Sequence, residues 1–387
     1  MIPRVKVNYR WRELLAAICS ASARDCSRLR ETLARLFAVE DVLLTPSGRG
    51  GLFFILSAVP HSRVVIPAYT CKAVVEAARL AGKTVLFLDA APQSFNCDTA
   101  GLAELLDADT VFIATHQFGI PCDIEASARI CRERGALLVE DCAASLGTRV
   151  GGRLTGTFGD AAFFSFDSTK LINVPLKAGF VIARTPELLA RIRASSEAAI
   201  EPMPFAHQCR LLALGAAYLV LEHPWLYRLY HTVTLRRRFT ADSPALDLTR
   251  TAFYRYAVTP WQAHIAAAQI ARLDAIIARR RSLHAVFRRM LEGCRHITLP
   301  PPDERGEWAC IRFPILVAGD KLMWYRAANA RGVDFAFSFT YLASPPEYTR
   351  AHTIARAVLD LPYYDKLTDA EFQHTVATLL QLDLSHV

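Results

Sequence analysis

The sequence predicts an α/β protein that is organised around a mainly parallel β-sheet. Two observations lead to this prediction: short apolar runs alternate with helical stretches between residues 62 and 184, and each run is apolar on both faces. Strands of this kind are typical of parallel sheets whose two faces are covered by helices. The chain has 387 residues, of which 52% are hydrophobic and 21% charged, so it can bury a large core and is not of the disordered class.

The predicted elements follow one another in a regular order. An N-terminal helical segment, residues 1–38, contains an amphipathic helix over residues 11–37. Helices are expected over residues 71–82 and 124–135, because each stretch ends at a glycine, the residue preferred just after a helix. The N-terminal segment leads into a large domain over residues 39–275, to which the two helices belong. Its strands are expected at residues 62–70, 83–90, 110–116, 136–143, 160–166 and 179–184.

The stretch 205–238 interrupts this order and is interpreted as an apolar helical insertion. Its core, residues 211–221, is apolar all round but shorter than the roughly 20 residues that span a bilayer. A buried helix at a domain or subunit contact is one interpretation. A contact with a membrane surface or a partner is the other, because aromatic residues and arginines flank the run.

The C-terminal part is expected to form a smaller α+β domain over residues 276–387. A long helix with an apolar stripe, residues 259–291, leads into it. The segment 310–318 is typical of a strand, and a last helix is expected after LPYYDKLTDAEF.

Composition excludes several classes of function. The net charge of +8 comes without a compact basic and aromatic patch, so no nucleic-acid partner is expected, whereas an anionic small molecule fits the charge. The ten cysteines include no CxxC pair and no zinc spacing, so no metal site is expected. Because the first residues lack a signal-peptide pattern, we expect a cytoplasmic protein with reduced thiols.

Polar side chains follow three of the predicted strands at their carboxyl ends, where open α/β sheets bind ligands. His116, Asp141 and Lys170 occupy these positions, and small residues around Gly48 open a helix whose N-terminus suits a phosphate. A desolvated lysine can form a Schiff base, and a buried aspartate can hold a pyridinium nitrogen. Together these groups are what pyridoxal phosphate (PLP) requires. Taken singly, a surface lysine, an N-cap aspartate and a core histidine remain alternatives.

Six segments give the chain a family resemblance over roughly residues 40–185 and 255–380. The most specific is LLVEDCAASLGTRVGGRLTGTFGDAAFFSFDSTK. The supporting segments are PSGRGGL, VVIPAYTCKAVVEAARLAGKTVLFLD, THQFGIPCDIEA, QAHIAAAQIARLD and LPYYDKLTDAEF. In these segments the chain resembles the DegT/StrS-type sugar aminotransferases, which are fold-type I PLP enzymes with a seven-stranded sheet in the large domain.

The resemblance implies an activity and a set of roles. Members of this family are homodimers with shared active sites, and they transfer an amino group, usually from glutamate, to a nucleotide-linked keto sugar. Lys170 is implied as the Schiff-base lysine and proton shuttle, Asp141 as the partner of the pyridine nitrogen, and His116 as a residue near the ring. The phosphate is implied to bind Ser165, Ser47 and the amides of Gly48 and Arg49.

The chain also departs from the family pattern near both cofactor and substrate. Cys71 replaces the aromatic that stacks on the cofactor, with Tyr69 as a possible substitute, and Arg49 and Arg255 replace neutral phosphate-binding residues. On the substrate side we expect Lys177, Phe337, Phe339 and Tyr341. These changes leave two alternatives open: a PLP enzyme with a non-sugar substrate or a different bond cleavage, and a degenerate scaffold or regulatory protein.

Overall fold

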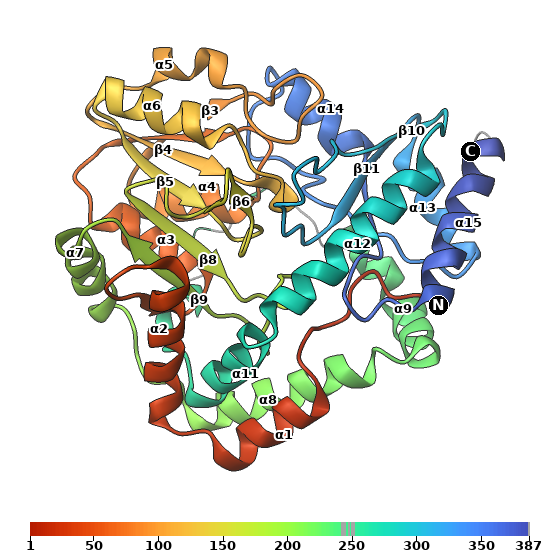
Figure 1. Ribbon diagram of the computed structural model, residues 1–387, viewed down its shortest axis with the longest axis horizontal. Coiled ribbons are helices and arrows are strands. Elements are labelled where there is room, and N and C mark those ends of the chain that lie inside the picture. Colours follow the sequence, from red (N-terminus) through yellow and green to blue (C-terminus); the bar gives the residue numbers. More distant parts are fainter. Residues whose placement is uncertain (241–244, 247, 249–251, 386–387) are drawn as a thin grey trace.

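A seven-stranded sheet organises the computed structural model, which describes residues 1–240, 245–246, 248 and 252–385 (Figure 1). The strand order is β1-β9-β8-β5-β4-β2-β3. The strands of this sheet are β1 (Leu43–Thr45), β2 (Arg63–Pro67), β3 (Thr84–Leu88), β4 (Thr110–Thr115), β5 (Leu137–Asp141), β8 (Ala161–Ser165) and β9 (Gly179–Ala183). A two-stranded ribbon, β6 (Arg149–Val150) and β7 (Arg153–Leu154), lies outside it.

The register of the sheet brings polar residues to one edge. β2, β3, β4, β5 and β8 run parallel to one another, and Thr115 of β4 lies opposite Asp141 of β5. β9 is antiparallel to both β8 and β1. The predicted mainly parallel sheet of seven strands is therefore confirmed. β1 was not predicted, because three residues are too short a run for an apolar pattern.

Helices cover both faces of the sheet, so each strand is buried on two sides. Alternate residues of β8 enter different cores: Phe163 packs on one face and Phe164 on the other. On the Phe163 face lie α3 (Gly48–Ser57), α4 (Lys72–Leu80) and α7 (Pro186–Glu197). On the opposite face lie α2 (Ala23–Phe37), α6 (Ile124–Arg134) and α11 (Pro260–Ile270). Shorter elements are η1 (Thr99–Gly101), α5 (Leu102–Leu105), η2 (Gln117–Gly119) and α10 (Ala252–Arg255).

Two helices that were predicted as continuous are each divided. The first is split into α1 (Trp11–Ser20) and α2, because Ser22 and Asp25 form a capping box that starts a new helix. The second is split into α11 and α12 (Leu273–Leu291) at Arg272, whose backbone is not helical. Both predictions of a single helix were wrong, since an apolar stripe continues across a short break.

The C-terminal part carries a separate antiparallel sheet, which includes the strand expected within residues 310–318. The sheet has the order β10-β11-β12 and is flanked by α12 and three later helices. Its elements are β10 (Ile297–Thr298), β11 (Phe313–Val317), α13 (Lys321–Ala330), α14 (Thr349–Ala357), β12 (Val358–Leu361) and α15 (Asp369–Ser385). The domain boundaries at 38 and 275 stay a prediction.

The insertion forms two helices: α8 (Phe205–Val220) runs along the lower side of the molecule in Figure 1, and α9 (Pro224–Thr240) lies at its right. α8 is anchored where the Tyr9 hydroxyl donates a hydrogen bond to the Gly215 carbonyl at 3.1 Å. In the described part of the chain, no helix combines the length and apolar character needed to cross a membrane.

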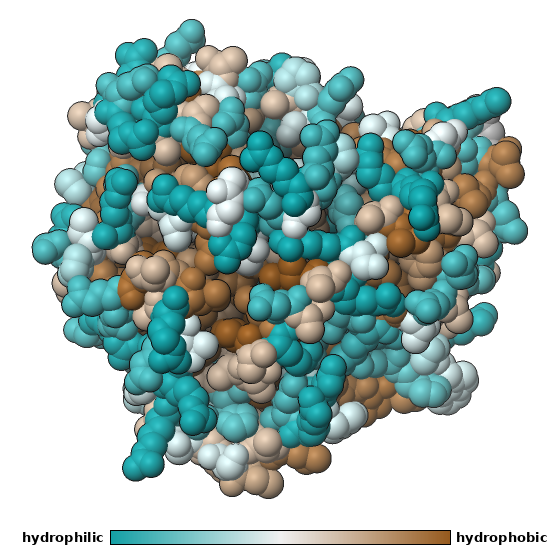
Figure 2. All heavy atoms as spheres, viewed as in Figure 1, coloured by the Kyte–Doolittle hydropathy of each residue, from teal (hydrophilic) through white to brown (hydrophobic). Residues whose placement is uncertain are grey.

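The insertion also exposes apolar side chains, among them Trp225 at 66% and Val233 at 72%. The face in Figure 2 carries hydrophobic patches in its lower half, whereas its upper half is mainly hydrophilic. A membrane or partner contact through residues 205–238 stays a prediction, and the side chains of residues 235–238 lie outside the description.

Candidate active site

A cavity of about 410 Å³ opens at the carboxyl ends of the parallel strands, where the sequence predicted a ligand. Three strand ends contribute Thr115, Asp141 and Ser165 to its wall. The first turns of α3 and α4 and the loop 337–341 complete the enclosure. Its size is within the range of cavities that hold small molecules and cofactors.

Lys170 lies in a tight turn directly after β8 and lines this cavity. Asp167 builds the turn: its carbonyl accepts the Lys170 N–H at 2.9 Å, and its carboxylate accepts the Thr169 N–H at 3.1 Å. Burial lowers the pKa of Lys170, and the nearby charges of Asp167 and Asp141 offset this in part. A lysine whose pKa is lowered presents a larger neutral, nucleophilic fraction.

Asp141 ends β5 and faces the same cavity as Lys170. The Ala143 N–H donates to its carboxylate at 3.0 Å and fixes its orientation. Burial raises the pKa of Asp141, while this hydrogen bond and the charge of Lys170 act in the opposite direction. The carboxylate is therefore poised to gain stability from a cationic partner in the cavity.

The start of α3 forms a close-fitting cradle beside these two residues. Ser47 caps the helix by accepting the Gly50 N–H at 3.0 Å, which leaves Gly48 and Arg49 as the first two helical residues. The N–H groups of a first helical turn point away from the helix, and the helix dipole favours an anion there. A Cβ at Gly48 would lie 2.9 Å from the Ser165 Cβ, so only glycine lets the helix approach the end of β8 this closely.

Two of the cations that were predicted from the sequence also line the cavity, and each is ion-paired to an acid. The Arg49 guanidinium lies 2.8 Å from the buried Glu76 carboxylate, and the Lys177 ammonium lies 3.6 Å from Asp167. The aromatic residues predicted on the substrate side, Phe337, Phe339 and Tyr341, line the cavity as well.

Arg312, which sequence reasoning missed, lies in the same wall. It stands one residue before β11, and its guanidinium is 3.4 Å from the buried Asp360 carboxylate. Its charge also acts to lower the pKa of Lys170. No motif surrounds Arg312, and the helices between it and Lys170 in the sequence conceal their proximity in the fold.

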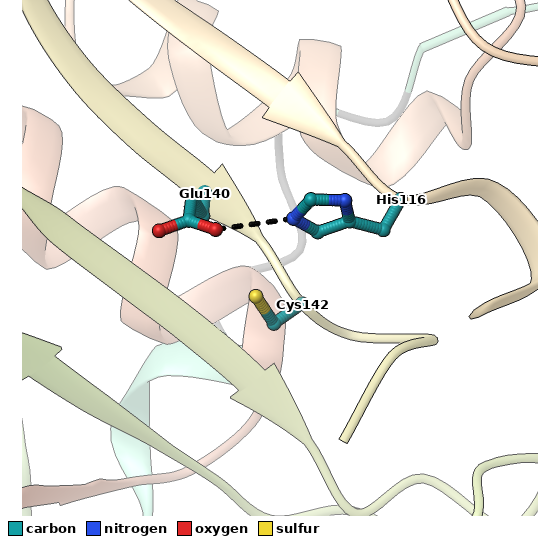
Figure 3. Close-up of side chains that lie close together, drawn as sticks. All are labelled: His116, Glu140 and Cys142. Atoms are coloured by element: carbon teal, nitrogen blue, oxygen red, sulfur yellow. Dashed lines mark hydrogen bonds and ion pairs between the residues drawn. The ribbon is translucent and has the colours of Figure 1, made fainter. Parts of the chain in front are cut away.

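His116 is not among the residues that line the cavity, in contrast to its expected place near the cofactor ring. It is completely buried; the Cys122 N–H donates to its Nδ1 at 3.2 Å, so Nε2 carries the proton and donates to Glu140 at 3.1 Å (Figure 3). His116 therefore lies behind the end of β4 and holds Glu140 in place, while its catalytic role stays a prediction.

His116, Glu140 and Cys142 present ligand atoms within 4.8 Å of one another (Figure 3). Both oxygens of Glu140 are already hydrogen-bonded, since each accepts at least one backbone N–H at 2.7 Å from residues 156–159. Both nitrogens of His116 are engaged as well, and burial raises the pKa of the Cys142 thiol. With every donor occupied or protonated, the group is a hydrogen-bonded support and not a metal site.

Two further predicted cofactor residues lie away from the cavity wall. Tyr69 is buried behind it, with its ring 5.5 Å from that of Phe339 and its hydroxyl directed to the Ser338 carbonyl at 3.4 Å. Arg255 is on the surface, with its side chain 52% exposed and 3.0 Å from Glu201. Cys71, the residue that replaces the stacking aromatic of the family, lies at the N-terminus of α4 and lines the cavity.

These residues fit PLP, because the cavity combines an amine, a carboxylate and an N-terminal helix cradle in one wall. Lys170 would hold the cofactor covalently, Asp141 would pair with its ring nitrogen, and the start of α3 with Ser165 would hold its phosphate. A fold of this topology with such a site defines a fold-type I PLP-dependent enzyme.

Comparison with known proteins shows which family this is. Residues 8–380 match the DegT/DnrJ/EryC1/StrS aminotransferase family, so the chain belongs to that family, whose members depend on PLP. The dTDP-4-dehydro-2,3,6-trideoxy-D-glucose 4-aminotransferase of Saccharopolyspora spinosa is 26% identical over 359 residues, which cover 90% of this chain and 85% of that protein. GDP-perosamine synthase of Vibrio cholerae is 25% identical over 278 residues, or 71% and 64% of the two chains.

A solved structure shares the fold over its whole length. The PMP form of Spr1654 from Streptococcus pneumoniae, described as a sugar aminotransferase, superposes with a TM-score of 0.78 at 16% identity and covers 100% of both chains. The fold and the PLP-dependent aminotransferase class expected from the sequence are thereby confirmed.

Proposed function

We propose that the protein transfers an amino group from glutamate to a keto sugar carried on a nucleotide. The observation that carries this proposal is the placement of Lys170 and Asp141 on one cavity, where their charges influence each other's pKa. Two relatives that cover most of this chain are named for reactions on dTDP- and GDP-linked sugars, which supports a nucleotide-linked acceptor.

The bound cofactor supplies an electron sink for the bond that is broken at the substrate carbon. Lys170, once freed as a neutral amine, accepts the α-proton of the amino donor. Its lowered pKa favours this neutral state. Asp141 keeps a negative charge beside the ring nitrogen. The buried floor of the cavity, which includes Phe163, limits the access of water to the transferred proton.

We further infer a cytoplasmic homodimer. All ten cysteines are free thiols, which agrees with a reducing compartment. Arg255 points to solvent at 52% exposure, so its role at a phosphate requires a second subunit that brings it to the neighbouring cavity. Such exchange of residues is compatible with a two-fold interface, in which each subunit uses the same surface.

An absorption spectrum tests cofactor, Schiff base and first half-reaction together. Addition of PLP to the cofactor-free protein should produce the band of the protonated Schiff base, and excess glutamate should replace it with the amine form while 2-oxoglutarate is released. The Lys170→Ala variant is the control and should show neither change. A wild-type protein that remains colourless would instead support a degenerate scaffold or regulator, and a coloured protein that releases another product would support a different PLP reaction.

A further inference from the structure

Lys170 is carried by an irregular segment, residues 166–178, that joins β8 to β9. The structure describes this whole segment, and it contains neither helix nor strand. Its backbone groups therefore depend on partners from other parts of the fold. Because a reactive amine must be held in the right place to meet its target, those partners decide where Lys170 can act.

Asn173 is the centre of the contacts that hold this segment. It is buried, and its side-chain amide donates a hydrogen bond to the Lys170 carbonyl at 3.0 Å. Its side-chain oxygen accepts the Asn8 N–H at 3.0 Å. Its backbone N–H and carbonyl are both bonded to the side chain of Gln269, at 3.2 and 2.7 Å. Each polar group of Asn173 thus has a partner, and one of these partners is the lysine itself.

The N-terminal residues supply one side of this arrangement. Asn8 is fully buried, and its side-chain amide donates to the carbonyl of Leu171, the residue that follows Lys170. Asn8 is fixed in turn by Arg272, whose guanidinium donates to the Asn8 carbonyl and lies 3.2 Å from the Glu13 carboxylate of α1. The segment that carries the lysine is therefore bonded to the start of the chain.

Helix α11 supplies the other side and holds the segment at two points. Gln262 and Gln269 are about two helical turns apart, so they lie on the same face of α11. The Nε2 of Gln262 donates to the carbonyls of Pro175 and Lys177, each at 3.1 Å. Leu176 lies between these carbonyls with a φ of 69°, in the left-handed region that a side chain disfavours. Such a conformation persists only where surrounding contacts impose it.

We propose that Asn173 is a positioning residue for Lys170, held by Gln269 and Asn8, and that it keeps the lysine backbone in the geometry needed for Schiff-base formation. An amide side chain suits this role, because its nitrogen donates to the lysine carbonyl while its oxygen accepts from Asn8. A segment that is already ordered loses little conformational entropy when the covalent bond forms. This inference rests on the proposed function, which assigns the Schiff base to Lys170.

The test separates covalent capture of the cofactor from its non-covalent binding. Lys170 can capture PLP covalently, whereas pyridoxine phosphate carries an alcohol in place of the aldehyde and binds only through its ring and phosphate. The affinities of the cofactor-free protein for both compounds are measured by calorimetric titration, with the Schiff-base absorbance as a second readout for PLP. In Asn173→Ala the ratio of the affinity for PLP to that for pyridoxine phosphate should fall about tenfold. A merely structural role would weaken both affinities equally and leave the ratio unchanged.

The matched control is Asn96→Ala. Asn96 is also buried; its amide donates to the Ile120 and Pro121 carbonyls at 3.1 and 3.0 Å, and its oxygen accepts the Gln117 N–H at 3.0 Å. The substitution therefore removes a similar set of hydrogen bonds outside the segment 166–178. Its melting temperature should fall by a similar amount, while the ratio of the two affinities should stay at the wild-type value.

Gln269→Leu tests the same role with the Asn173 side chain in place, and it decides the question if Asn173→Ala does not fold. It removes the bonds from α11 to the Asn173 backbone, so the affinity ratio should again fall. A wild-type ratio in the folded variants of Asn173 and Gln269 would overturn the proposal. A wild-type protein that forms no Schiff-base band counts instead against the proposed function.

Discussion

Lys170 is surrounded by charges whose removal should move its reactivity in opposite directions. Burial and Arg312 lower its pKa, whereas Asp167 raises it. Because the neutral amine attacks an aldehyde, Asp167→Asn should speed covalent capture of PLP at neutral pH, and Arg312→Gln should slow it. The measurement is the rate at which the Schiff-base band appears in the cofactor-free protein as a function of pH. Profiles that shift in the same direction for both variants would contradict this electrostatic account.

The second prediction concerns Asp141, whose substitution should lower activity without lowering stability. Burial raises the pKa of Asp141, so the folded protein binds this proton more tightly than the unfolded chain does, and the resulting contribution to stability is lost as pH rises through the folded pKa. Asp141→Asn has no carboxyl group that titrates, so this decrease of stability with rising pH disappears. Its amide oxygen can still accept the Ala143 N–H. At neutral pH the cofactor-free variant should therefore melt no lower than the wild type, yet react with glutamate about a hundredfold more slowly. A variant that melts lower and keeps its rate would contradict the assignment.

Sequence reasoning was most effective for residues whose role depends on a strand end. Lys170 and Asp141 follow apolar strands, and parallel strands bring their carboxyl ends to one edge, so their shared cavity could be inferred from the pattern. His116 follows the same rule, but its side chain points to Glu140 inside the protein. Strand position fixes where the backbone lies, and only the packing of neighbouring side chains decides the direction of a ring. Arg312 depends on contacts between distant segments, which leave no local signal.

At the scale of elements, the third prediction concerns the close contact between the start of α3 and the end of β8. A methyl group at Gly48 would meet the Ser165 Cβ at 2.9 Å and the Phe164 carbonyl at 3.3 Å. Gly48→Ala should push the helix start away from the strand, cost about 1–3 kcal/mol of stability and weaken PLP binding. The control is Gly101→Ala, where the added methyl would approach no atom closer than 3.8 Å. Melting temperature and cofactor titration of the two variants check this prediction.

An apolar pattern in the sequence locates strands well but does not show where a helix is interrupted. The six strands predicted for the large sheet lie within a few residues of β2, β3, β4, β5, β8 and β9, because apolar runs on both faces are long enough to identify them. The divisions between α1 and α2 and between α11 and α12 were missed, since a break of two residues leaves the apolar stripe nearly in phase. Ser22 and Asp25 form an N-terminal capping pair that could have revealed the first division. No comparable signal precedes Leu273, whose helix has no side-chain cap.

At the scale of the whole molecule, three distant segments are tied together around another cavity, of about 460 Å³, which borders the first. Lys6 pairs with Glu371 at 2.7 Å, and Lys366 pairs with Glu222 of the insertion. The Tyr227 hydroxyl donates to the buried Asp334 carboxylate. The cavity thus exists only once the N-terminal residues, the insertion and the C-terminal part have assembled, which explains why the sequence could locate the insertion but not its role.

The last prediction concerns how two subunits share a site. If Arg255 acts in the neighbouring cavity, a hybrid dimer of one Lys170→Ala subunit and one Arg255→Ala subunit contains one intact site, because the first subunit donates its arginine to the lysine of the second. Each homodimer should be weakly active or inactive, and an equal mixture after subunit exchange should recover about a quarter of the wild-type sites. The control mixture combines Lys170→Ala with Asp141→Asn, whose residues line the same cavity, and should recover nothing. The same absence of recovery in the Arg255 mixture would place Arg255 outside the neighbouring site.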